Sequence, residues 1–426
     1  MKKVLIITYY WPPASGPGMQ RVFKFAKYLP KFGWDPVILT VEKGNFPSYD
    51  HSFEKEISDN IRVYRTKIFE PFEIYNKLRG RGKKKSIPTF ILSKSSNDSI
   101  LDKAIKYVRG NFLIPDAKIG WQRYIVKSGL EIIKNEKIDL IFSSSPPHSL
   151  QLGARKLAKI SKLKWVADFR DPWTDAFWQK DIARLKFAKN KDKKYETNVL
   201  LNADKIITVG ANIAKEFENS TGKKIEIISN GYDKSDFEIN KTKHSKFRIV
   251  YAGTLGESQK IDNFIEALIN LKDKFKDLLE VSFYGTFHKS ITDFITLNNA
   301  TEIITIHEPV DHSEVIKKIV NAEVLLLVIP EALGNEGILT GKLFEYLATN
   351  NTILGIGPKN GDASNILMET GAGKMFDYDD DITSFLEDSL NNWILNNEES
   401  PTKTNIDKYS RERLTEELSK IFEECL

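Results

Sequence analysis

Small residues gather at several places in this sequence where a phosphate could be bound. The first is Gly16-Pro17-Gly18, which follows an apolar run and precedes a segment whose apolar residues have helical spacing. Glycines before a helix let backbone N–H groups approach an anion, and the helix dipole adds to the attraction. We expect a phosphate there, and the alternative is a plain turn. The stretch is not a dinucleotide fingerprint, because that pattern needs a third glycine.

A second glycine pair stands in the same context in the other half of the chain. Gly253-Thr254-Leu255-Gly256 follows another apolar run, and Lys260 comes six residues after Thr254. Two glycine loops at the starts of two similar halves indicate a ligand held between two domains.

A third stretch, Asn335 to Gly341, leads into a helical segment that contains Lys342 and Glu345. Backbone donors after Thr340 and the Lys342 ammonium suit a phosphate, and the Glu345 carboxylate can accept hydrogen bonds from a ribose diol. The alternative is that Lys342 and Glu345 form an i, i+3 surface pair.

Two further candidates lie where strands of the first half are expected to end. Asp171 follows Asp168-Phe169-Arg170, and His148 follows a serine cluster. The carboxyl ends of parallel strands are where open α/β sheets bind ligands, which makes both residues candidates for catalysis. We expect Arg170 to keep the Asp171 carboxylate ionised. A lone histidine in a loop is also often incidental.

The candidate site residues must be positioned by the secondary structure around them. Short apolar runs rich in β-branched residues alternate along the chain with segments of helical period. This alternation predicts buried parallel strands joined by crossover helices. The expected strands are residues 3–7, 35–40, 139–143, 164–168, 205–209, 224–228, 247–252, 280–284, 303–307, 323–329 and 352–356. The charged stretch 233–246 interrupts the series and reads as a linker between two α/β domains.

The last residues have a different pattern. After Pro401, five apolar positions fall on one face of a helix, namely Leu414, Leu418, Ile421, Phe422 and Cys425. Such a face must be covered, and docking on the body of the protein is the first expectation, with a partner or a membrane surface as the alternative.

Composition excludes several classes of protein. The 426 residues are 41% hydrophobic and have a formal net charge of +5, which fits a folded protein and does not favour nucleic acid as a partner. The single cysteine, Cys425, excludes an intramolecular disulfide and a thiolate metal site, so a cytoplasmic location is expected. No spacing typical of metal ligands is found. Basic residues concentrate between 77 and 85, which is either a solvated loop or a contact with anionic headgroups.

The ordered set of motifs resembles family 4 of the glycosyltransferases. The motifs that carry the resemblance are Tyr9-Tyr10-Trp11-Pro12-Pro13, Ser144-Ser145-Pro146-Pro147-His148, Asp168-Phe169-Arg170-Asp171-Pro172-Trp173, Asn230-Gly231-Tyr232-Asp233, Tyr251-Ala252-Gly253-Thr254 and Gly341-Lys342-Leu343-Phe344-Glu345-Tyr346. They occur in order over nearly the whole chain.

The resemblance implies a GT-B fold of two Rossmann-like domains that face each other across a cleft. Residues 1–235, joined by the C-terminal helix 404–426, would receive the acceptor, and residues 236–403 would hold the nucleotide sugar, of UDP or GDP type. By position, Glu345 would bind the ribose and Val310 the edge of the base. The diphosphate would lie against Lys260, the backbone at Thr340 and Gly341, and Gly16 to Gly18 of the other domain. Gly253, Thr254 and Lys342 complete the expected donor-binding residues.

The same resemblance implies a metal-independent enzyme without a cofactor that transfers a sugar with retention of configuration. The expected acceptor is a glycan or a lipid-linked molecule in polysaccharide or cell-envelope synthesis, reached at the inner face of the membrane. Catalysis is assigned to Asp171, His148 and Lys260. Gly337 stands where the family has the first of two glutamates, with Glu336 displaced by one position.

Two other functions remain open. One is a sugar-nucleotide epimerase of the same fold, which would need no acceptor site. The other is a catalytically silent protein that binds a membrane surface through the basic region, a reading favoured by Gly337.

Overall fold

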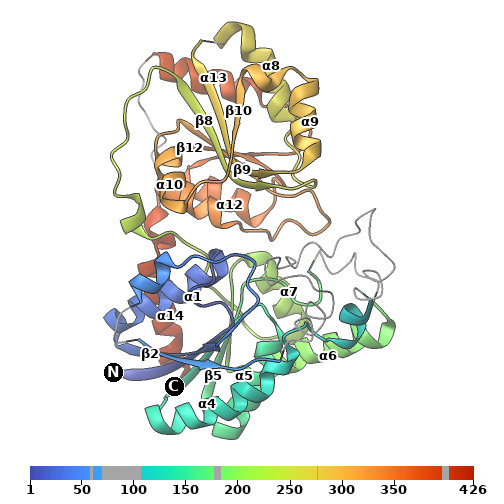
Figure 1. Cartoon of the computed structure of the whole chain (residues 1–426), viewed down its shortest axis with the longest axis vertical. Helices are drawn as coiled ribbons and strands as arrows, with labels where there is room; N and C mark the ends of the chain where they lie inside the picture. The colour runs from blue at the N-terminus through green and yellow to red at the C-terminus, as the bar shows by residue number, and fades with distance from the viewer. Residues whose placement is uncertain (58–60, 70–106, 177–183, 276, 396–402) are drawn as a thin grey trace. The chain divides into compact units, whose positions relative to one another are not determined.

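The computed structural model describes residues 1–57, 61–69, 107–176, 184–275, 277–395 and 403–426. The chain divides into two compact units (Figure 1). The first contains Met1–Ser229 and Arg411–Leu426, and the second contains Asn230–Ser410. Each unit is an α/β domain built on its own parallel sheet, as the sequence pattern predicts.

The first unit has a seven-stranded parallel sheet in the order β3-β2-β1-β4-β5-β6-β7. Its strands are β1 (Lys2–Thr8), β2 (Trp34–Val41), β3 (Arg62–Thr66), β4 (Leu140–Ser145), β5 (Lys164–Phe169), β6 (Lys205–Thr208) and β7 (Glu226–Ile227). Its described helices are α1 (Pro17–Tyr28), α4 (Gln122–Glu136), α5 (Ser149–Ser161), α6 (Lys186–Asn202), α7 (Ala211–Thr221) and α14 (Arg411–Cys425). Short 3₁₀ turns are found at Leu29–Phe32, Ser52–Glu56 and Ile119–Trp121.

The second unit repeats the plan with a six-stranded parallel sheet in the order β10-β9-β8-β11-β12-β13. Its strands are β8 (Phe247–Leu255), β9 (Leu279–Phe287), β10 (Ile304–His307), β11 (Val324–Val328), β12 (Thr352–Ile356) and β13 (Gly373–Phe376). Its described helices are α8 (Asp262–Phe275), α9 (Lys289–Leu297), α10 (His312–Val320), α11 (Gly341–Ala348), α12 (Asp362–Thr370) and α13 (Thr383–Ile394). Short 3₁₀ turns are found at Lys234–Phe237, Ala300–Glu302 and Ile406–Tyr409.

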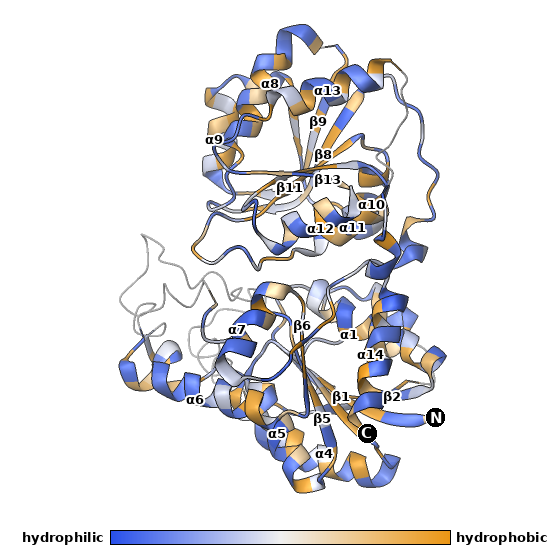
Figure 2. Cartoon of the chain, turned by 180° about the vertical axis from the view of Figure 1, so that it is seen from behind, coloured by the Kyte–Doolittle hydropathy of each residue, from blue (hydrophilic) through white to orange (hydrophobic). Residues whose placement is uncertain are grey.

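The apolar residues of the strands form the cores. Every residue of β4 and β11 is buried, as expected for strands covered on both faces. Figure 2 shows hydrophobic residues along the strands of each sheet and hydrophilic residues on the outer sides of the helices. In each unit the strand order reverses beside the first strand, so β1 lies between β2 and β4, and β8 between β9 and β11. Such a reversal is where open α/β sheets bind ligands.

All the expected strands are present, and two of the strands in the described ranges were missed. Both missed strands, β3 and β13, lie at the edge of a sheet. An edge strand needs less apolar surface, and these two contain Arg62, Arg65 and Lys374, which hide the apolar pattern. β8 and β9 each run three residues past the expected end, so Gly253, Thr254 and Leu255 belong to a strand and not to a loop.

The division between the units differs from the expected one at both crossings. The sequence places residues up to 235 in the first domain and the returning tail from 404, whereas the structure changes units after Ser229 and after Ser410. The cause is the pairing of the two crossing segments within the second unit. Tyr232 N donates to Tyr409 O at 3.1 Å, and Tyr232 and Tyr409 are both buried in the core of that unit.

The C-terminal helix α14 belongs to the first unit, where it packs against α1. The five apolar residues that the sequence places on one face are all buried. The Phe422 ring lies 5.1 Å from the Trp34 ring and 5.5 Å from the Phe142 ring. Among the helices described for this chain, none has the length and apolar character needed to cross a bilayer.

Candidate functional site

The candidate residues of the first unit lie where β1, β4 and β5 end. Gly16 precedes α1 and has a φ of 104°, a conformation that L side chains rarely adopt. Its carbonyl accepts from Met19 N and Gln20 N, both at 3.1 Å, and so begins the helix. The turn therefore aims the start of a twelve-residue helix at the carboxyl edge of the sheet, which is the geometry that the sequence predicts for an anion site.

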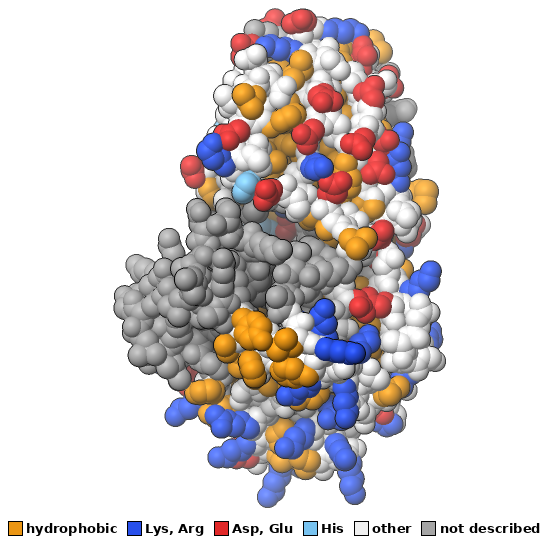
Figure 3. Space-filling view, turned by 90° about the vertical axis from the view of Figure 1, so that its right-hand side faces the viewer, with side chains coloured by type: hydrophobic (Ala, Val, Ile, Leu, Met, Phe, Trp, Pro, Cys, Tyr) orange, Lys and Arg blue, Asp and Glu red, His pale blue; other side chains and the backbone are white. Residues whose placement is uncertain are grey.

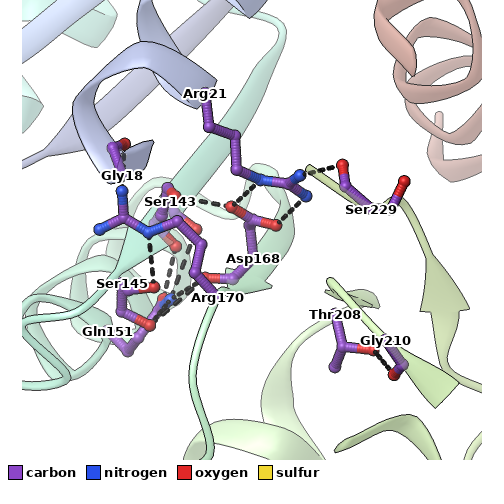
Figure 4. A network of polar contacts seen from close by, with 11 residues as sticks. Gly18, Arg21, Ser143, Ser145, Gln151, Asp168, Arg170, Thr208, Gly210 and Ser229 are labelled. Carbon is purple, nitrogen blue, oxygen red and sulfur yellow. Dashed lines mark hydrogen bonds and ion pairs between the residues drawn. The ribbon is translucent and has the colours of Figure 1, made fainter. Parts of the chain in front are cut away.

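Arg170 holds this turn in place (Figure 4). Its guanidinium donates to the carbonyls of Gly18, of Ser145 at 3.0 Å and of Pro146 at 2.7 Å. A Cβ on Gly18 would lie 2.4 Å from Arg170 Nη1, so glycine is needed for this contact. One buried side chain thus connects the start of α1 with the end of β4.

A second arginine makes a fully buried ion pair beside it. Arg21 Nε and Nη2 lie 3.2 and 2.8 Å from the two carboxylate oxygens of Asp168, and neither side chain is exposed. Arg21 Nη1 also donates to the carbonyl of Ser229 at 2.6 Å, at the last residue before the chain enters the second unit (Figure 4). With Ser144 Oγ donating to Asp168 at 2.6 Å, both partners have their hydrogen bonds satisfied, which a buried pair requires. The sequence did not reveal this pair.

His148 is packed into the same edge. Its ring stacks on the Trp173 ring with centroids 4.9 Å apart, and Nε2 lies 3.2 Å from the carbonyl of Pro172. Burial lowers the pKa of His148 to about 3, so the imidazole is neutral, and we assign its proton to Nε2 from that contact. Nδ1 is then an acceptor, and it is buried without a hydrogen-bond partner in the described part of the chain. Because this atom is not exposed, a ligand hydroxyl reaches it only if the side chains that cover it shift.

Asp171 lies two residues before Trp173 and is half-buried. Burial raises the pKa of Asp171, and the positive charge of Arg170 only partly opposes this effect. Arg170 thus acts on the Asp171 pKa in the direction that the sequence predicts, but burial has the larger effect, and the hydrogen bonds of Arg170 go to backbone carbonyls. A carboxyl group with a raised pKa is suited to exchange a proton.

In the second unit, two glycines let β8 and β9 run side by side to the edge of the sheet. Gly253 and Gly285 are paired across the strands and have φ values of 129° and 139°. A Cβ on Gly285 would lie 2.0 Å from the carbonyl oxygen of Gly253, so no other residue fits there. The open face of Gly253 is covered by the Lys342 side chain, whose Nζ would lie 2.5 Å from a Cβ at that position.

Lys342 is thereby aimed at the end of β8 from the first turn of α11. Its Nζ lies 4.3 Å from the centre of the Tyr251 ring and donates to Tyr251 Oη at 2.5 Å. Tyr251 Oη in turn donates to the carbonyl of Thr254 at 2.7 Å. Burial lowers the pKa of Lys342 to about 8, with the Glu345 charge opposing the shift. The sequence did not identify Tyr251 as a partner.

The start of α11 adds polar groups next to Lys342. Thr340 precedes the helix, Gly341 is its first residue, and Thr340 Oγ1 is buried without a partner among the described residues. Glu345, one turn further, lies 3.1 Å from His312 Nε2. Lys342 and Glu345 thus have different hydrogen-bond partners, which argues against the simple surface pair that the sequence left open.

Two residues that the sequence predicts to bind the donor lie elsewhere on the second unit. Lys260 is exposed in the turn after β8 and forms an ion pair with Glu331 at 2.6 Å. Val310 follows β10 and is 41% exposed. Near it, the rings of His307 and Tyr284, at the ends of β10 and β9, stack with centroids 4.4 Å apart. The structure thus brings together Gly253, Thr340, Gly341 and Lys342, while Lys260 lies on the acidic side chain of Glu331.

The remaining candidates add little to this site. Glu336, next to Gly337, is half-buried, and its carbonyl accepts from Asp362 N at 2.7 Å. The basic region 77–85 lies outside the described residues.

The chain was compared with known families and structures. The model of Glycosyltransferase Family 4 matches residues 19–236, which is 218 of the 426 residues. A search of curated proteins found no match.

Solved structures share the fold over the whole chain. A glycosyltransferase from Rickettsia africae ESF-5 has a TM-score of 0.62 and 14% identity, covering 100% of this chain and 98% of that one. HepE of Anabaena, solved in complex with UDP, has a TM-score of 0.62 and 11% identity with 100% of both chains covered. S. aureus TarM, solved with UDP and α-GlcNAc-glycerol, has a TM-score of 0.58 and 13% identity, covering 99% of this chain and 100% of that one.

Proposed function

Since the chain belongs to glycosyltransferase family 4 and is a glycosyltransferase of the GT-B fold, we propose that it transfers a hexose-type sugar from a nucleoside diphosphate to an acceptor hydroxyl. We further propose that the anomeric configuration is retained, that no metal ion is needed, and that the product is a polysaccharide or cell-envelope glycan. HepE and TarM were solved with UDP, so UDP-sugars are the first donors to test.

The position of Lys342 carries the proposal. Its ammonium stands over Gly253, at the end of β8 beside the reversal of strand order, and it has no carboxylate within hydrogen-bond distance among the described residues. A half-buried cation that rests on a tyrosine hydroxyl still has two N–H donors to offer. Together with the N-terminus of α11 it forms a site for the diphosphate of a nucleotide sugar.

The second unit also has groups suited to the rest of the donor. Glu345 can accept from the ribose hydroxyls once they replace His312, and the stacked His307 and Tyr284 rings lie near Val310, where the base is expected. Lys260 reaches the diphosphate only if it leaves Glu331. Lys260 would then pair with the Glu331 carboxylate in the free protein and with the diphosphate in the complex, so it forms an ion pair in both states.

The proposed reaction breaks the bond between the anomeric carbon and the diphosphate oxygen, and the acceptor hydroxyl attacks from the same face. The acceptor proton passes to the departing diphosphate, whose growing charge Lys342 and the start of α11 stabilise. In the first unit, we assign His148 Nδ1, an acceptor without a partner in the described part of the chain, to a sugar hydroxyl, and Asp171, whose pKa is raised by burial, to proton exchange. These cationic and polar groups supply the charge stabilisation, so we expect activity to persist in EDTA.

A panel of UDP-, GDP- and other nucleotide sugars tests the proposal by thermal shift, because a ligand that binds only the folded state raises the melting temperature. At about 100 times its Kd, the correct donor adds about 2.7 kcal/mol of stability. Lys342→Met should remove most of this shift, whereas Lys274→Met, which changes an exposed lysine paired with Glu387, should keep it.

The activity assay then separates transfer from the alternative. Release of the nucleoside diphosphate only when an acceptor is present supports transfer, and an isomerised donor without release indicates an epimerase. The coupling constant of the anomeric proton in the product tests retention. A wild-type protein that no nucleotide sugar stabilises would contradict the proposal.

A further inference from the structure

The two units have opposite net charges, which the formal charge of +5 for the whole chain conceals. Residues 1–229 and 411–426 contain 46 basic and 29 acidic residues, a formal net charge of +17. Residues 230–410 contain 17 basic and 29 acidic residues, a formal net charge of −12. On the face seen in Figure 3, Lys and Arg side chains accordingly gather on the first unit, beside a group of hydrophobic side chains. The basic unit is expected to approach anionic surfaces.

Helix α6 shows how this charge is arranged. Its first three turns carry five exposed lysines, namely Lys186, Lys189, Lys191, Lys193 and Lys194. Both acidic residues of the same stretch, Asp192 and Glu196, are buried. Asp192 binds Arg184 and the Trp173 indole, and Glu196 accepts from Thr174. The charges on the outer face of these turns are therefore all positive.

These lysines are also largely without partners of opposite charge. Lys193 pairs with Glu196 at 2.5 Å, whereas Lys186, Lys189, Lys191 and Lys194 form no ion pair with any described residue. Four unpaired ammonium groups on three turns repel one another unless an anion lies against them.

Large apolar side chains are exposed at the beginning of this basic face. Phe187 is 49% exposed and Leu185 41% exposed, and Phe112, with its ring 6.0 Å from that of Phe187, is 61% exposed. The segment around Phe112 is fixed to the start of α6, because Arg184 Nε donates to Gly110 O at 2.9 Å and Leu185 N donates to Asn111 Oδ1 at 2.6 Å. We call Phe112, Leu185, Phe187 and the four unpaired lysines the α6 face.

We propose that the α6 face docks the first unit on the surface of a lipid bilayer that contains anionic lipids. Aromatic and aliphatic side chains enter the boundary between headgroups and acyl chains, while neighbouring lysines bind the anionic headgroups. Exposed aromatic rings bordered by lysines favour this boundary over a soluble polyanion as the partner, because a polyanion offers no apolar layer. Pairing with the same face of a second copy would bring eight ammonium groups together and is disfavoured by their repulsion.

Sedimentation of the full chain with vesicles tests this surface. The vesicles contain phosphatidylcholine alone or phosphatidylcholine with 30% phosphatidylglycerol, and the anionic vesicles should bind more tightly. Reversal of three charges, K186E/K189E/K191E, should lower the partition coefficient about 100-fold, since each basic side chain near an anionic surface contributes about 1 kcal/mol. The matched control K127E/K134E/K137E changes three exposed lysines of the α4 region by the same total charge and should bind within about threefold of wild type.

A second variant separates a bilayer from a soluble polyanion. F112S/F187S should weaken binding to anionic vesicles about tenfold or more and leave retention on heparin unchanged, because heparin has no apolar layer. The proposal is overturned if this variant binds vesicles like wild type, if the control loses as much binding as the α6 reversal, or if the reversal alters only dimerisation in size-exclusion chromatography. Circular dichroism and donor-induced thermal shifts of the variants show that folding and nucleotide binding are intact, so failure of this surface is distinguishable from failure of the proposed transfer reaction.

Discussion

At the scale of single residues, the packing of Lys342 at the start of α11 determines how readily its ammonium group loses a proton. Its side chain crosses Gly253 and ends on the Tyr251 hydroxyl, and burial there lowers its pKa to about 8. An ammonium whose pKa is close to the ambient pH gains its full charge when an anion arrives. Donor binding should therefore be coupled to proton uptake.

This coupling predicts how affinity changes with pH. The protonated form binds the diphosphate, and in the free protein it is lost as the pH rises through about 8. The affinity for the nucleoside diphosphate should therefore fall roughly tenfold between pH 7.5 and pH 9, in proportion to the protonated fraction of Lys342. Titration calorimetry at several pH values measures this affinity. Lys342→Arg keeps its charge throughout this range and should bind with a flat profile; a profile that keeps the wild-type slope would assign the titration to another group.

Arg170 leads to a prediction about a contact between two distant motifs. Its side chain donates to three carbonyls, and a Cβ on Gly18 would collide with it. Arg170→Met and Gly18→Ala should each destabilise the protein by about 1–3 kcal/mol, because either change leaves buried carbonyls without donors. Since both break the same contact, the double variant should cost less than the sum. Urea unfolding of the four proteins measures this, and additive costs would show that Arg170 does not act through the Gly18 turn.

At the scale of elements, the position of the donor groups depends on how closely β8 and β9 approach each other. The paired glycines allow both strands to reach the edge of the sheet, where Lys342 covers Gly253. Any side chain at Gly285 would push the strands apart and displace the Gly253 backbone against which Lys342 packs.

Alanine should destabilise the protein at one glycine of this region and be tolerated at another. Gly285→Ala puts a Cβ 2.0 Å from the Gly253 carbonyl oxygen at a φ of 139°, and it should destabilise the protein by more than about 3 kcal/mol. Gly256→Ala is the control, because the nearest atom to its Cβ, Gln259 Oε1, is 3.6 Å away; it should stay within about 0.5 kcal/mol of wild type. Chemical denaturation measures both, and equal costs would show that the strand contact is not the cause.

At the scale of the whole molecule, the chain leaves the first unit at Ser229 and returns to it at Arg411. The returning helix is held by Phe422, which packs between Trp34 and Phe142. The last sixteen residues are thus part of the core of the first unit and not an appendage.

Removal of the Phe422 ring tests this role. Phe422→Ala should destabilise the first unit by about 3–5 kcal/mol, the usual cost of emptying a buried aromatic site. Tryptophan fluorescence reports on this unit, because six of the seven tryptophans belong to it. Lys420→Ala, an exposed position on the same helix, should change the stability by less than about 0.5 kcal/mol. A neutral Phe422→Ala would mean that α14 only lies on the surface.

Much of the architecture was readable without coordinates, because the signals for it are local. The two series of apolar runs place the strands to within three residues, and the five apolar positions of α14 are those that are buried. The start of α11 could be predicted for the same reason, from the glycines, Lys342 and Glu345. A strand end, a turn and a helix start are neighbours in the chain, so their signals are local. The edge strands β3 and β13 escaped because a half-covered strand needs little apolar sequence.

Contacts between distant segments were not readable, because they depend on which side chains meet once the sheets form. Arg21 and Asp168 are 147 positions apart, and Lys342 and Tyr251 are 91 apart, so no local pattern connects them. Burial also changed the protonation equilibria of two candidate residues. It raised the pKa of Asp171 against the expected effect of Arg170, and it made His148 a neutral acceptor. Local order along the chain is enough to choose the fold and the candidate motifs, whereas partners and protonation states follow from the desolvation and long-range pairing that exist only in the folded protein.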